Sequence, residues 1–336
     1  MSIANIRLLN QQLVNPQMSD IHELVAWMGM LQAQEYTMMR WAVGIRLKQP
    51  SMSSFRKAYD SGQVVRTHLF RCTWQLVAAE DLRWMLKLCA DKNKNAIRYF
   101  GQGISEKDFE HACDLICQAL AGQQSMTREA IIASLRELGL SGDAYTMTKF
   151  LQMAEAEGLI CSGHLDDNQN TYALIDGRIP SANEPSREES VILLARKYFR
   201  SHSPATLKDF AWWTNLSTGE CKNAINSIAD ELTAERRNDD IYYIHHDCRT
   251  RGCRKRILLL PSYDEYLIGY KSRHHAIAEQ FCRQAYNKNG IFYPVIVQNG
   301  EVIGNWHPRK QANFFEDENK VDISKLLSDF HQFMDC

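Results

Sequence analysis

One short pattern in the sequence has the residue types and spacing for chemistry: two glutamines separated by one small apolar residue, Gln32-Ala33-Gln34. Each side-chain amide has an oxygen that accepts hydrogen bonds and an NH2 group that donates them. Two amide oxygens on the same side of a chain can accept hydrogen bonds from one water molecule and so place it for attack. On a helix, residues two apart point about 200° away from each other. In an extended segment both face the same side, so the pair makes sense as a site only where the chain leaves a helix.

The residues before the pair predict the helix that positions it. Asp20 is a suitable N-terminal cap, with Glu23 at the third position after it. Apolar residues then recur at helical spacing, at Ile21, Leu24, Val25, Met28 and Leu31. We expect this helix to end between Gly29 and Leu31. Glu35 would face away from the pair, which favours a surface or salt-bridging role and makes it the substitute candidate if the pair is idle.

Farther along the chain, the element order of a winged helix occurs twice. Residues 64–78 first predict one or two strands, because they are rich in β-branched and aromatic residues. Helices are then expected at 106–121, 126–138 and 143–157, followed by a two-stranded wing. The same order recurs after a linker at 178–186 that is rich in Pro, Ser and Asn. The first hundred residues fit a further copy of this element order, in which the pattern is less clear.

From Ile241 onward strand patterns dominate, and a short amphipathic helix is expected from Ser324. The stretch 256–270, RILLLPSYDEYLIGY, belongs to these strands. Asp264 within it is expected to hold a turn or an arginine, or to be a buried site acid. We therefore predict an α+β protein of tandem winged-helix units with a C-terminal β-rich module. The expected parts are residues 1–104 with the glutamine pair, 105–178, 186–240 and 241–336.

Basic residues gather in one segment although the formal net charge of the 336-residue chain is -1. Residues 247–256 lie between two predicted strands and contain Arg249, Arg251, Arg254, Lys255 and Arg256. Arginines on a thin two-stranded ribbon can enter a DNA minor groove or follow phosphates. A solvated loop with excess charge is the alternative.

A second basic set places an aromatic residue beside cations. It comprises Trp306, His307, Arg309 and Lys310. Aromatic rings and cations together are typical of nucleic-acid contacts. A packed tryptophan at the edge of a barrel explains the same pattern equally well.

Several other functions find no support in the sequence. It contains no G-x-G-x-x-G, Walker A, H-E-x-x-H or G-x-S-x-G motif. The group His245, His246, Cys248 and Cys253 matches no standard zinc-finger spacing, so we expect no metal. No apolar stretch reaches the roughly 18 to 20 residues that span a bilayer, and the first residues are amphipathic rather than signal-like. We expect a soluble, cytoplasmic, nucleoid-associated protein.

Three segments together resemble the tandem winged-helix family of bacterial DNA glycosylases of the azinomycin-resistance type. They are Gln32-Ala33-Gln34, residues 66–77 (RTHLFRCTWQLV), and residues 259–270 (LLPSYDEYLIGY) with Arg273. The resemblance runs across nearly the whole chain, and the family motif is Gln, an apolar residue, then Gln or Asp. Two positions depart from the family pattern: Cys72 stands where Gly is usual, and Gln75 where a His is expected.

The resemblance implies that Gln32 and Gln34 are the catalytic residues and that no cofactor is needed. It also implies that Arg66, His68 and Arg71 lie near this site and contact phosphate or the lesion. The alternative for these three is pairing with acids inside the first unit. The implied partner is double-stranded DNA that contains an alkylated purine.

The predicted function is therefore that of a monofunctional DNA glycosylase, which hydrolyses the N-glycosidic bond of N7-alkylguanine-type purines, including bulky or crosslinked ones. The alternative is a non-catalytic winged-helix DNA-binding protein or transcriptional regulator. A regulator is usually a symmetric dimer that reads spaced half-sites. Three different units in one chain favour a monomer that wraps a single lesion.

Overall fold

The computed structural model describes residues 2–181 and 185–335, and these fall into two compact units. The first unit joins residues Met1–Phe55 to Val191–Cys336, so it is built from both ends of the chain, and the second comprises Arg56–Ser190. The linker predicted at 178–186 includes residues 182–184, which lie outside the described residues. Among the described helices, none has the length and apolar character needed to cross a membrane.

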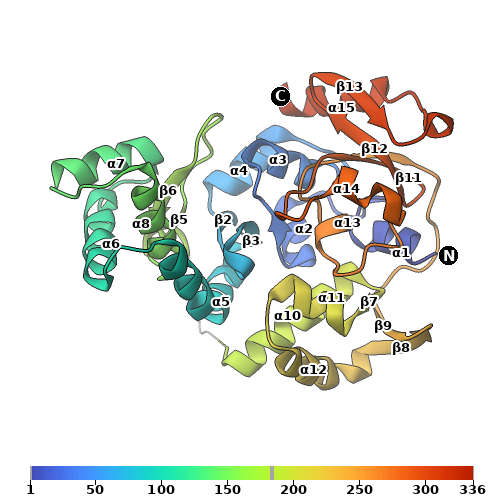
Figure 1. The fold of residues 1–336 in the computed structure, drawn as a ribbon, viewed down its shortest axis with the longest axis horizontal. Helices are drawn as coiled ribbons and strands as arrows, with labels where there is room; N and C mark the ends of the chain where they lie inside the picture. The colour runs from blue at the N-terminus through green and yellow to red at the C-terminus, as the bar shows by residue number, and fades with distance from the viewer. Residues whose placement is uncertain (1, 182–184, 336) are drawn as a thin grey trace. The chain divides into compact units, whose positions relative to one another are not determined.

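The second unit begins with a hairpin and a long helix and continues with a helix, a short strand, two helices and a second hairpin (Figure 1). All three strand pairs described in this unit are antiparallel, and the later sheet has the order β4-β6-β5. The elements are β2 (Val64–His68), a 3-10 turn (Phe70–Cys72), β3 (Trp74–Ala78), α5 (Ala79–Phe100), α6 (Glu106–Leu120), β4 (Met126–Thr127), α7 (Arg128–Glu137), α8 (Ala144–Ala156), β5 (Ile160–Ser162), β6 (Thr171–Leu174) and α9 (Ile175–Arg178). The strands predicted within 64–78 and the three helices after residue 105 are confirmed.

The same order of elements occurs again within the first unit. The sheet here has the order β7-β9-β8, which matches β4-β6-β5 position for position. The elements are α10 (Arg187–His202), β7 (Ala205–Thr206), α11 (Leu207–Thr214), α12 (Thr218–Ser227), a 3-10 turn (Ala229–Glu231), β8 (Leu232–Arg237) and β9 (Asp240–His245). Because β9 pairs with β8 along its whole length, the expected boundary at residue 240 falls inside this hairpin.

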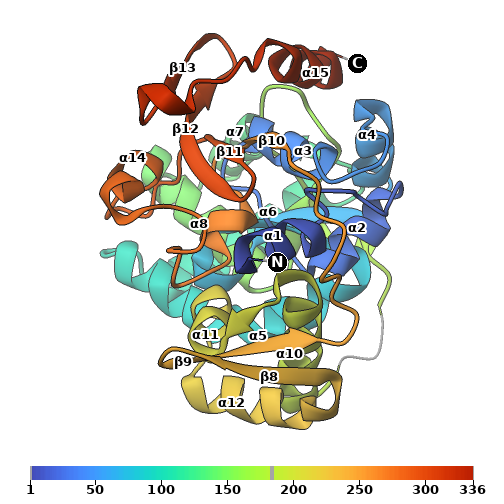
Figure 2. The same cartoon turned by 90° about the vertical axis from the view of Figure 1, so that its right-hand side faces the viewer.

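A four-stranded antiparallel sheet and the N-terminal helix share one core in the first unit. In both views α1 lies between the sheet and the group formed by α10, α11 and β7–β9 (Figure 1, Figure 2). Leu8 and Leu9 of α1 pack with Leu258, Val295 and Val297 of the sheet. The elements are α1 (Ile3–Asn10), β10 (Ile257–Leu260), β11 (Val295–Gln298), β12 (Glu301–His307) and β13 (Lys310–Phe314).

The remaining helices of the first unit connect the motif region to the C-terminus. Trp41 of α3 contacts Phe330 and Phe333 of α15, with ring centroids 5.4 and 5.6 Å away. Gly44 leaves room for Phe333, since a Cβ at this position would come within 2.7 Å of the ring. The elements are α2 (Ile21–Met28), β1 (Leu31–Gln32), α3 (Tyr36–Gly44), α4 (Met52–Asp60), which contains the boundary between the units, α13 (Glu265–Ile268), α14 (Cys282–Ala285) and α15 (Ser324–Asp335). The mixture of helices and antiparallel sheets confirms the α+β class.

The helix before the glutamine pair is as predicted. The Asp20 side chain accepts a hydrogen bond from the Glu23 N–H at 2.9 Å, which caps α2. Gly29 follows the helix with a φ of 78°, a conformation that favours glycine. Local sequence signals therefore account for the point at which the chain leaves α2.

Residues 256–270 do not form the long strand that we predicted. β10 ends at Leu260, and Pro261, which has no N–H for a strand ladder, follows it. Asp264 then accepts a hydrogen bond from the Tyr266 N–H at 2.9 Å and caps the short helix α13. The same carboxylate receives two hydrogen bonds from buried Arg46, at 2.8 and 2.9 Å. The expectation that Asp264 holds a turn or an arginine is confirmed on both counts.

The basic segment is not a hairpin either. β9 pairs with β8 and β7, whereas β10 pairs with β11, so residues 246–256 connect two different sheets. The two flanking strands look like a hairpin in the sequence because both are short and apolar. The prediction of a thin two-stranded ribbon is therefore wrong.

We predict that Asp264→Asn lowers the free energy of unfolding by about 3–5 kcal/mol, because it leaves the Arg46 guanidinium buried without its counter-ion. Urea denaturation followed by circular dichroism measures the change. Asp240→Asn is the control, since its ion pair with Lys208 is on the surface, and it should change stability far less. Equal effects of the two substitutions would contradict this assignment.

Candidate functional site

The glutamine pair lies where the chain runs from α2 into α3. β1 covers only Leu31–Gln32, and the chain bends at Gln34 before α3 begins at Tyr36. Gln32 is buried and Gln34 is exposed. The extended segment that we predicted therefore exists, but it is two residues long, and the two amides differ in exposure because the chain turns between them.

Glu35 has a defined structural role beside the pair. Its carboxylate accepts hydrogen bonds from the backbone N–H groups of Thr37 and Met38, at 3.3 and 2.6 Å. It is the N-terminal cap of α3, where a negative charge also favours the helix dipole. Glu35 is thus a capping residue rather than the salt-bridging acid that the sequence suggested.

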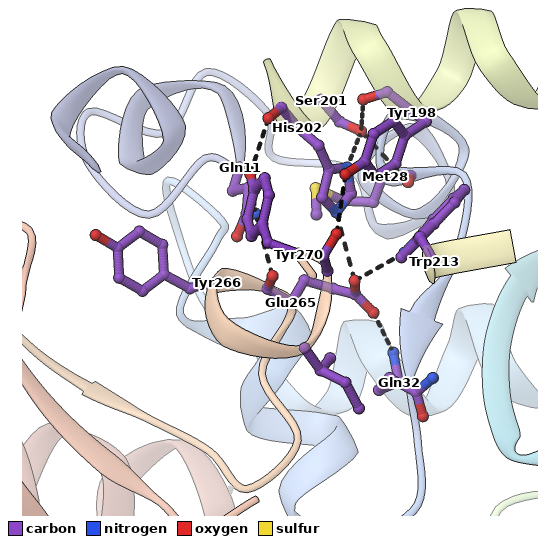
Figure 3. A network of polar contacts seen from close by, with 12 residues as sticks. Gln11, Met28, Gln32, Tyr198, Ser201, His202, Trp213, Glu265, Tyr266 and Tyr270 are labelled. Atoms are coloured by element: carbon purple, nitrogen blue, oxygen red, sulfur yellow. Dashed lines mark hydrogen bonds and ion pairs between the residues drawn. The ribbon is translucent and has the colours of Figure 1, made fainter. Parts of the chain in front are cut away.

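A buried carboxylate, Glu265 on α13, holds the backbone of the motif. Its Oε1 accepts a hydrogen bond from the Gln32 N–H at 2.9 Å. Its Oε2 accepts one from the Trp213 indole N–H at 3.0 Å and lies 3.4 Å from Nε2 of His202 (Figure 3). A buried carboxylate requires such partners, because an unpaired one costs several kcal/mol. Three other segments, which carry Gln32, His202 and Trp213, are therefore fixed around one side chain.

A second layer of hydrogen bonds surrounds this carboxylate (Figure 3). The Tyr270 hydroxyl donates to the His202 carbonyl at 2.9 Å, and the Gln11 amide donates to the Tyr270 hydroxyl at 3.0 Å. Oγ of Ser201 lies 2.8 Å from Nδ1 of His202. The ring of Tyr198 stacks on His202 with 4.7 Å between centroids. The position of His202 is therefore set on both ring nitrogens and on one face.

Burial lowers the pKa of His202, although the hydrogen bond with Glu265 and its charge act in the opposite direction. Arg46 and Arg7 also lower the pKa of His202 through their positive charges. Burial likewise raises the pKa of Tyr198 and of Tyr270. The imidazole is therefore neutral at pH 7, and the region around Glu265 contains neutral donors.

Arg66 and His68 are inside the second unit. Nδ1 of His68 lies 2.6 Å from Oε2 of buried Glu155, and the ring packs on Trp74 at 4.0 Å. The Arg66 guanidinium stacks on the same Trp74 at 3.8 Å and donates to the Asn170 side chain at 2.7 Å. Both residues are buried. His68 pairs with an acid as the alternative expected, but Glu155 lies beyond residues 1–104, and Arg66 contacts an amide and a tryptophan ring.

The turn after β2 explains the positions that depart from the family pattern. Arg71 and Cys72 have φ angles of 62° and 52°, and glycine adopts such angles most easily. Cys72 therefore occupies a left-handed position at which a glycine is the unstrained choice. The Gln75 side chain accepts a hydrogen bond from the Phe70 N–H at 3.1 Å and donates one to the Phe70 carbonyl at 3.3 Å. Burial raises the pKa of the Cys72 thiol to about 11.

The basic loop divides into one anchored and four exposed cations. The Arg249 side chain donates to the carbonyls of Leu9 and Asn15, and its N–H donates to the Asn10 side chain at 2.8 Å. Arg249 therefore attaches the loop to the end of α1. The exposed cations of the loop are Arg251, Arg254, Lys255 and Arg256.

The second basic set divides in the same way. The Trp306 ring is buried, and its indole N–H donates to the Leu260 carbonyl at 2.7 Å. It also contacts Phe330 at 5.1 Å, so the ring is packed in the core, as the alternative of a packed tryptophan expected. His307, Arg309 and Lys310 are exposed. Within the described ranges, no group of three or more His, Cys, Asp or Glu side chains could hold a metal ion.

A family model described as DNA glycosylase AlkZ-like matches residues 25–316. The chain belongs to the AlkZ-like family of DNA glycosylases. Over 298 residues it is 22% identical to an interstrand DNA cross-link repair glycosylase of Streptomyces sahachiroi. The aligned region covers 82% of this chain and 79% of that protein. The structure of Streptomyces sahachiroi DNA glycosylase AlkZ superposes with a TM-score of 0.77 at 18% identity and covers 99% of this chain and 94% of that one. This likeness confirms the fold.

The residues around Glu265 in this glycosylase were not predicted from the sequence. Glu265 is adjacent to Asp264, which drew attention because it is an acid in an apolar stretch, and the same signal applied to both. His202 and Trp213 gave no signal, because they lie at helix positions that also suit core residues. Their common partner is more than 50 residues away in the sequence, so no local pattern could connect them.

We predict that the glycosylase loses stability as the pH falls below about 6.5, because the unfolded chain then binds a proton at His202 that the folded chain does not. The loss continues until the pH reaches the lowered pKa of the folded state. Urea denaturation at pH 7.5 and 5.5 should show that the native protein loses on the order of 1 kcal/mol more than His202→Gln. An identical pH dependence in the two proteins would exclude this role for His202.

Proposed function

We propose that this glycosylase hydrolyses the N-glycosidic bond of N-alkylated purines in duplex DNA, with Gln32 and Gln34 as the catalytic residues. The preferred substrate is of the N7-alkylguanine type. The observation that carries the proposal is the hydrogen bond of 2.9 Å between the Gln32 N–H and buried Glu265, which fixes the backbone of the motif in a chain that belongs to a glycosylase family.

Two neutral amides suit this substrate class for a chemical reason. Hydrolysis of an N-glycosidic bond passes through an oxocarbenium-like state, and most enzymes provide an acid for the leaving group and a base for water. An N7-alkylated guanine is already cationic, so it leaves without protonation. The remaining task is to place a water molecule, which amide oxygens can do as hydrogen-bond acceptors. The barrier for an undamaged base stays high, because no acid assists its departure.

The position of Glu265 supports a preorganised motif. A carboxylate that is itself held by Trp213 and His202 cannot turn away from the Gln32 N–H without losing both contacts. Preorganised groups need no rearrangement as charge develops in the transition state. We therefore assign Glu265 as a positioning residue for Gln32.

We also propose that the two repeated sets of helices and hairpins are winged helices. Each has a helix, a short strand, two helices and a hairpin, with the short strand paired to the second hairpin strand. The winged helix is a DNA-binding motif in many proteins, although the fold alone does not establish a function.

Exposed cations provide the electrostatic part of DNA binding. The basic loop contributes Arg251, Arg254, Lys255 and Arg256, and the turn between β12 and β13 contributes His307, Arg309 and Lys310. Cations that contact phosphates supply most of the affinity for DNA irrespective of sequence. We assign Arg71 a phosphate or lesion contact and Arg66 and His68 a supporting role in the second unit. A monomer in the cytoplasm, associated with the nucleoid, would meet this partner.

The relative from Streptomyces sahachiroi is described as a repair glycosylase for interstrand DNA cross-links. We propose that bulky and crosslinked purine adducts are also substrates of this chain. Such lesions share the N-glycosidic bond and the cationic base, and they differ from small adducts in the size of the alkyl group.

We predict that Gln32→Ala and Gln34→Ala each slow the release of N7-methylguanine from a defined duplex by on the order of 100-fold or more. The rate should fall while the DNA affinity stays the same, because the amides act on water and not on phosphates. Single-turnover base release and fluorescence anisotropy measure the two quantities.

Two other glutamines serve as controls for these substitutions. Gln12 is buried like Gln32, and Gln102 is exposed like Gln34. Gln12→Ala and Gln102→Ala should keep the native rate. If the native protein binds duplex and releases no base, Cys72 and Gln75 become marks of a lost activity, and a non-catalytic DNA-binding function replaces this proposal.

A further inference from the structure

A cavity of about 620 Å³ lies within the first unit, at one edge of its four-stranded sheet. β10 is the strand at that edge, and the consecutive residues 256–259 line the cavity. The other walls come from α3 with the segment that follows it, and from α15. The proposed hydrolysis assigns no catalytic role to any of these residues.

Backbone groups of β10 face this cavity. In an antiparallel pair, successive residues alternate between bonding the partner strand and facing away from it. The Asn299 N–H of the turn after β11 donates to the Arg256 carbonyl at 3.0 Å, and Leu258 follows two residues later in the same register. Arg256 and Leu258 therefore face β11, whereas Ile257 and Leu259 direct their N–H and C=O groups to the edge of the sheet.

The edge is closed at one end and open at the other. The Trp41 indole N–H donates to the Leu259 carbonyl at 2.7 Å, which is the direction that the alternation requires. Ile257 begins β10, is half-buried and lines the cavity. An edge strand of this kind is a template to which an extended peptide can add as a further strand. A strand rises about 3.3 Å per residue, so residues 256–259 match a peptide segment of about four residues.

The base of the cavity is apolar. Trp41, Leu47 and Phe333 are buried lining residues, and Ile45 and Leu326 are half-buried ones. Successive side chains of a strand point to opposite sides. Every second side chain of an added peptide can therefore contact this base, and apolar side chains are the ones that gain from such burial.

The rim of the cavity carries cations that no acid neutralises. Lys48 and Arg256 line the cavity and are exposed, and in the described ranges neither side chain forms an ion pair. Asp329 also lines the cavity, but its carboxylate pairs with Lys325 at 3.0 Å. The local charge therefore complements an acidic partner, and it opposes a basic one.

We propose that this cavity binds an acidic, extended peptide segment of a partner protein, which adds to β10 as a further strand. The peptide backbone bonds Ile257, its apolar side chains contact the base, and its carboxylates pair with Lys48 and Arg256. Duplex DNA would use the cations but neither the strand edge nor the apolar base, so a protein partner accounts for all three features. This inference goes beyond the proposed hydrolysis and does not depend on it.

The test measures the binding of a fluorescein-labelled peptide of four Leu-Asp repeats to the full chain by fluorescence anisotropy. It is made without DNA, because Arg256 is also among the cations assigned to DNA. The native protein should bind this peptide. A peptide of four Leu-Lys repeats should bind at least about tenfold more weakly, because its charges oppose Lys48 and Arg256.

N-methylated peptides test the strand edge without changing the protein. One Leu-Asp peptide carries N-methyl groups on its leucines and the other on its aspartates, so both keep their side chains. The peptide whose methyl groups face β10 should bind at least about tenfold more weakly, because it loses its hydrogen-bond donors to the edge.

Variants test the same contacts from the side of the protein. Arg256→Glu reverses a charge at the rim and should weaken binding of the Leu-Asp peptide at least about tenfold. Arg251→Glu is the control, because Arg251 is an exposed residue of the same loop that does not line the cavity. Ile257→Pro removes the outward N–H at the first residue of an edge strand, where proline is tolerated, and should weaken binding similarly. Circular dichroism confirms folding, and the N-methylated peptides test the same bond if Ile257→Pro does not fold.

Several results would overturn the inference and leave the proposed function intact. The native protein would bind neither repeat peptide, or would bind both equally. N-methylation of the leucines and of the aspartates would leave the affinity unchanged, which excludes the addition of a strand. A native dimer that Ile257→Pro dissociates, measured by light scattering, would assign the edge to a second copy of this chain instead of a peptide.

Discussion

The structure of the first unit depends on the buried carboxylate of Glu265. A charged group inside a protein is tolerated only if hydrogen bonds replace its water. Here the donors are the Gln32 backbone and the Trp213 indole, with the His202 ring 3.4 Å away. These groups come from β1, α11 and α10, so satisfying one carboxylate fixes the ends of three elements from both halves of a discontinuous unit. Arg46 and Asp264 fix the helix that carries Glu265 in the same way.

This constraint explains how an unremarkable pair of glutamines acquires a defined position. α2 ends at Gly29, the Gln32 N–H is held by Glu265, and Glu35 caps the next helix. The chain is therefore held before the motif by the end of α2, within it by the bond to Glu265, and after it by the cap of α3. For the substrate proposed above, whose base is already a good leaving group, neutral amides are enough to place the water. In the proposed function, the exposed cations attract the DNA and take no part in the chemistry.

Local signals predicted the elements well, because a helix cap or a breaking residue acts on its neighbours. Asp20 and Gly29 delimit α2 as expected, and the repeated order of helices and hairpins follows from periodicity. Contacts across long distances could not be predicted. The core that joins Leu8 to Val295, the anchoring of Arg249 on α1, the burial of Trp306 and the bond from Glu265 to Gln32 all link residues that no sequence pattern relates. Counting cations could not reveal that Arg249 holds the loop to α1, and the resemblance to a family pointed to the glutamine pair without the residues that hold its backbone.

The most direct test of this account is the single-turnover rate of N7-methylguanine release by Glu265→Gln, measured together with DNA affinity. The amide keeps the size of the side chain but faces two N–H donors with a single oxygen. We predict that the rate falls at least about tenfold while the protein stays folded and binds duplex DNA as tightly as before. Glu231→Gln is the control. It removes the negative charge that pairs with Arg196, away from the glutamine motif, and should keep the native rate. A folded Glu265→Gln protein with the native rate would contradict the claim that this carboxylate positions the catalytic glutamines.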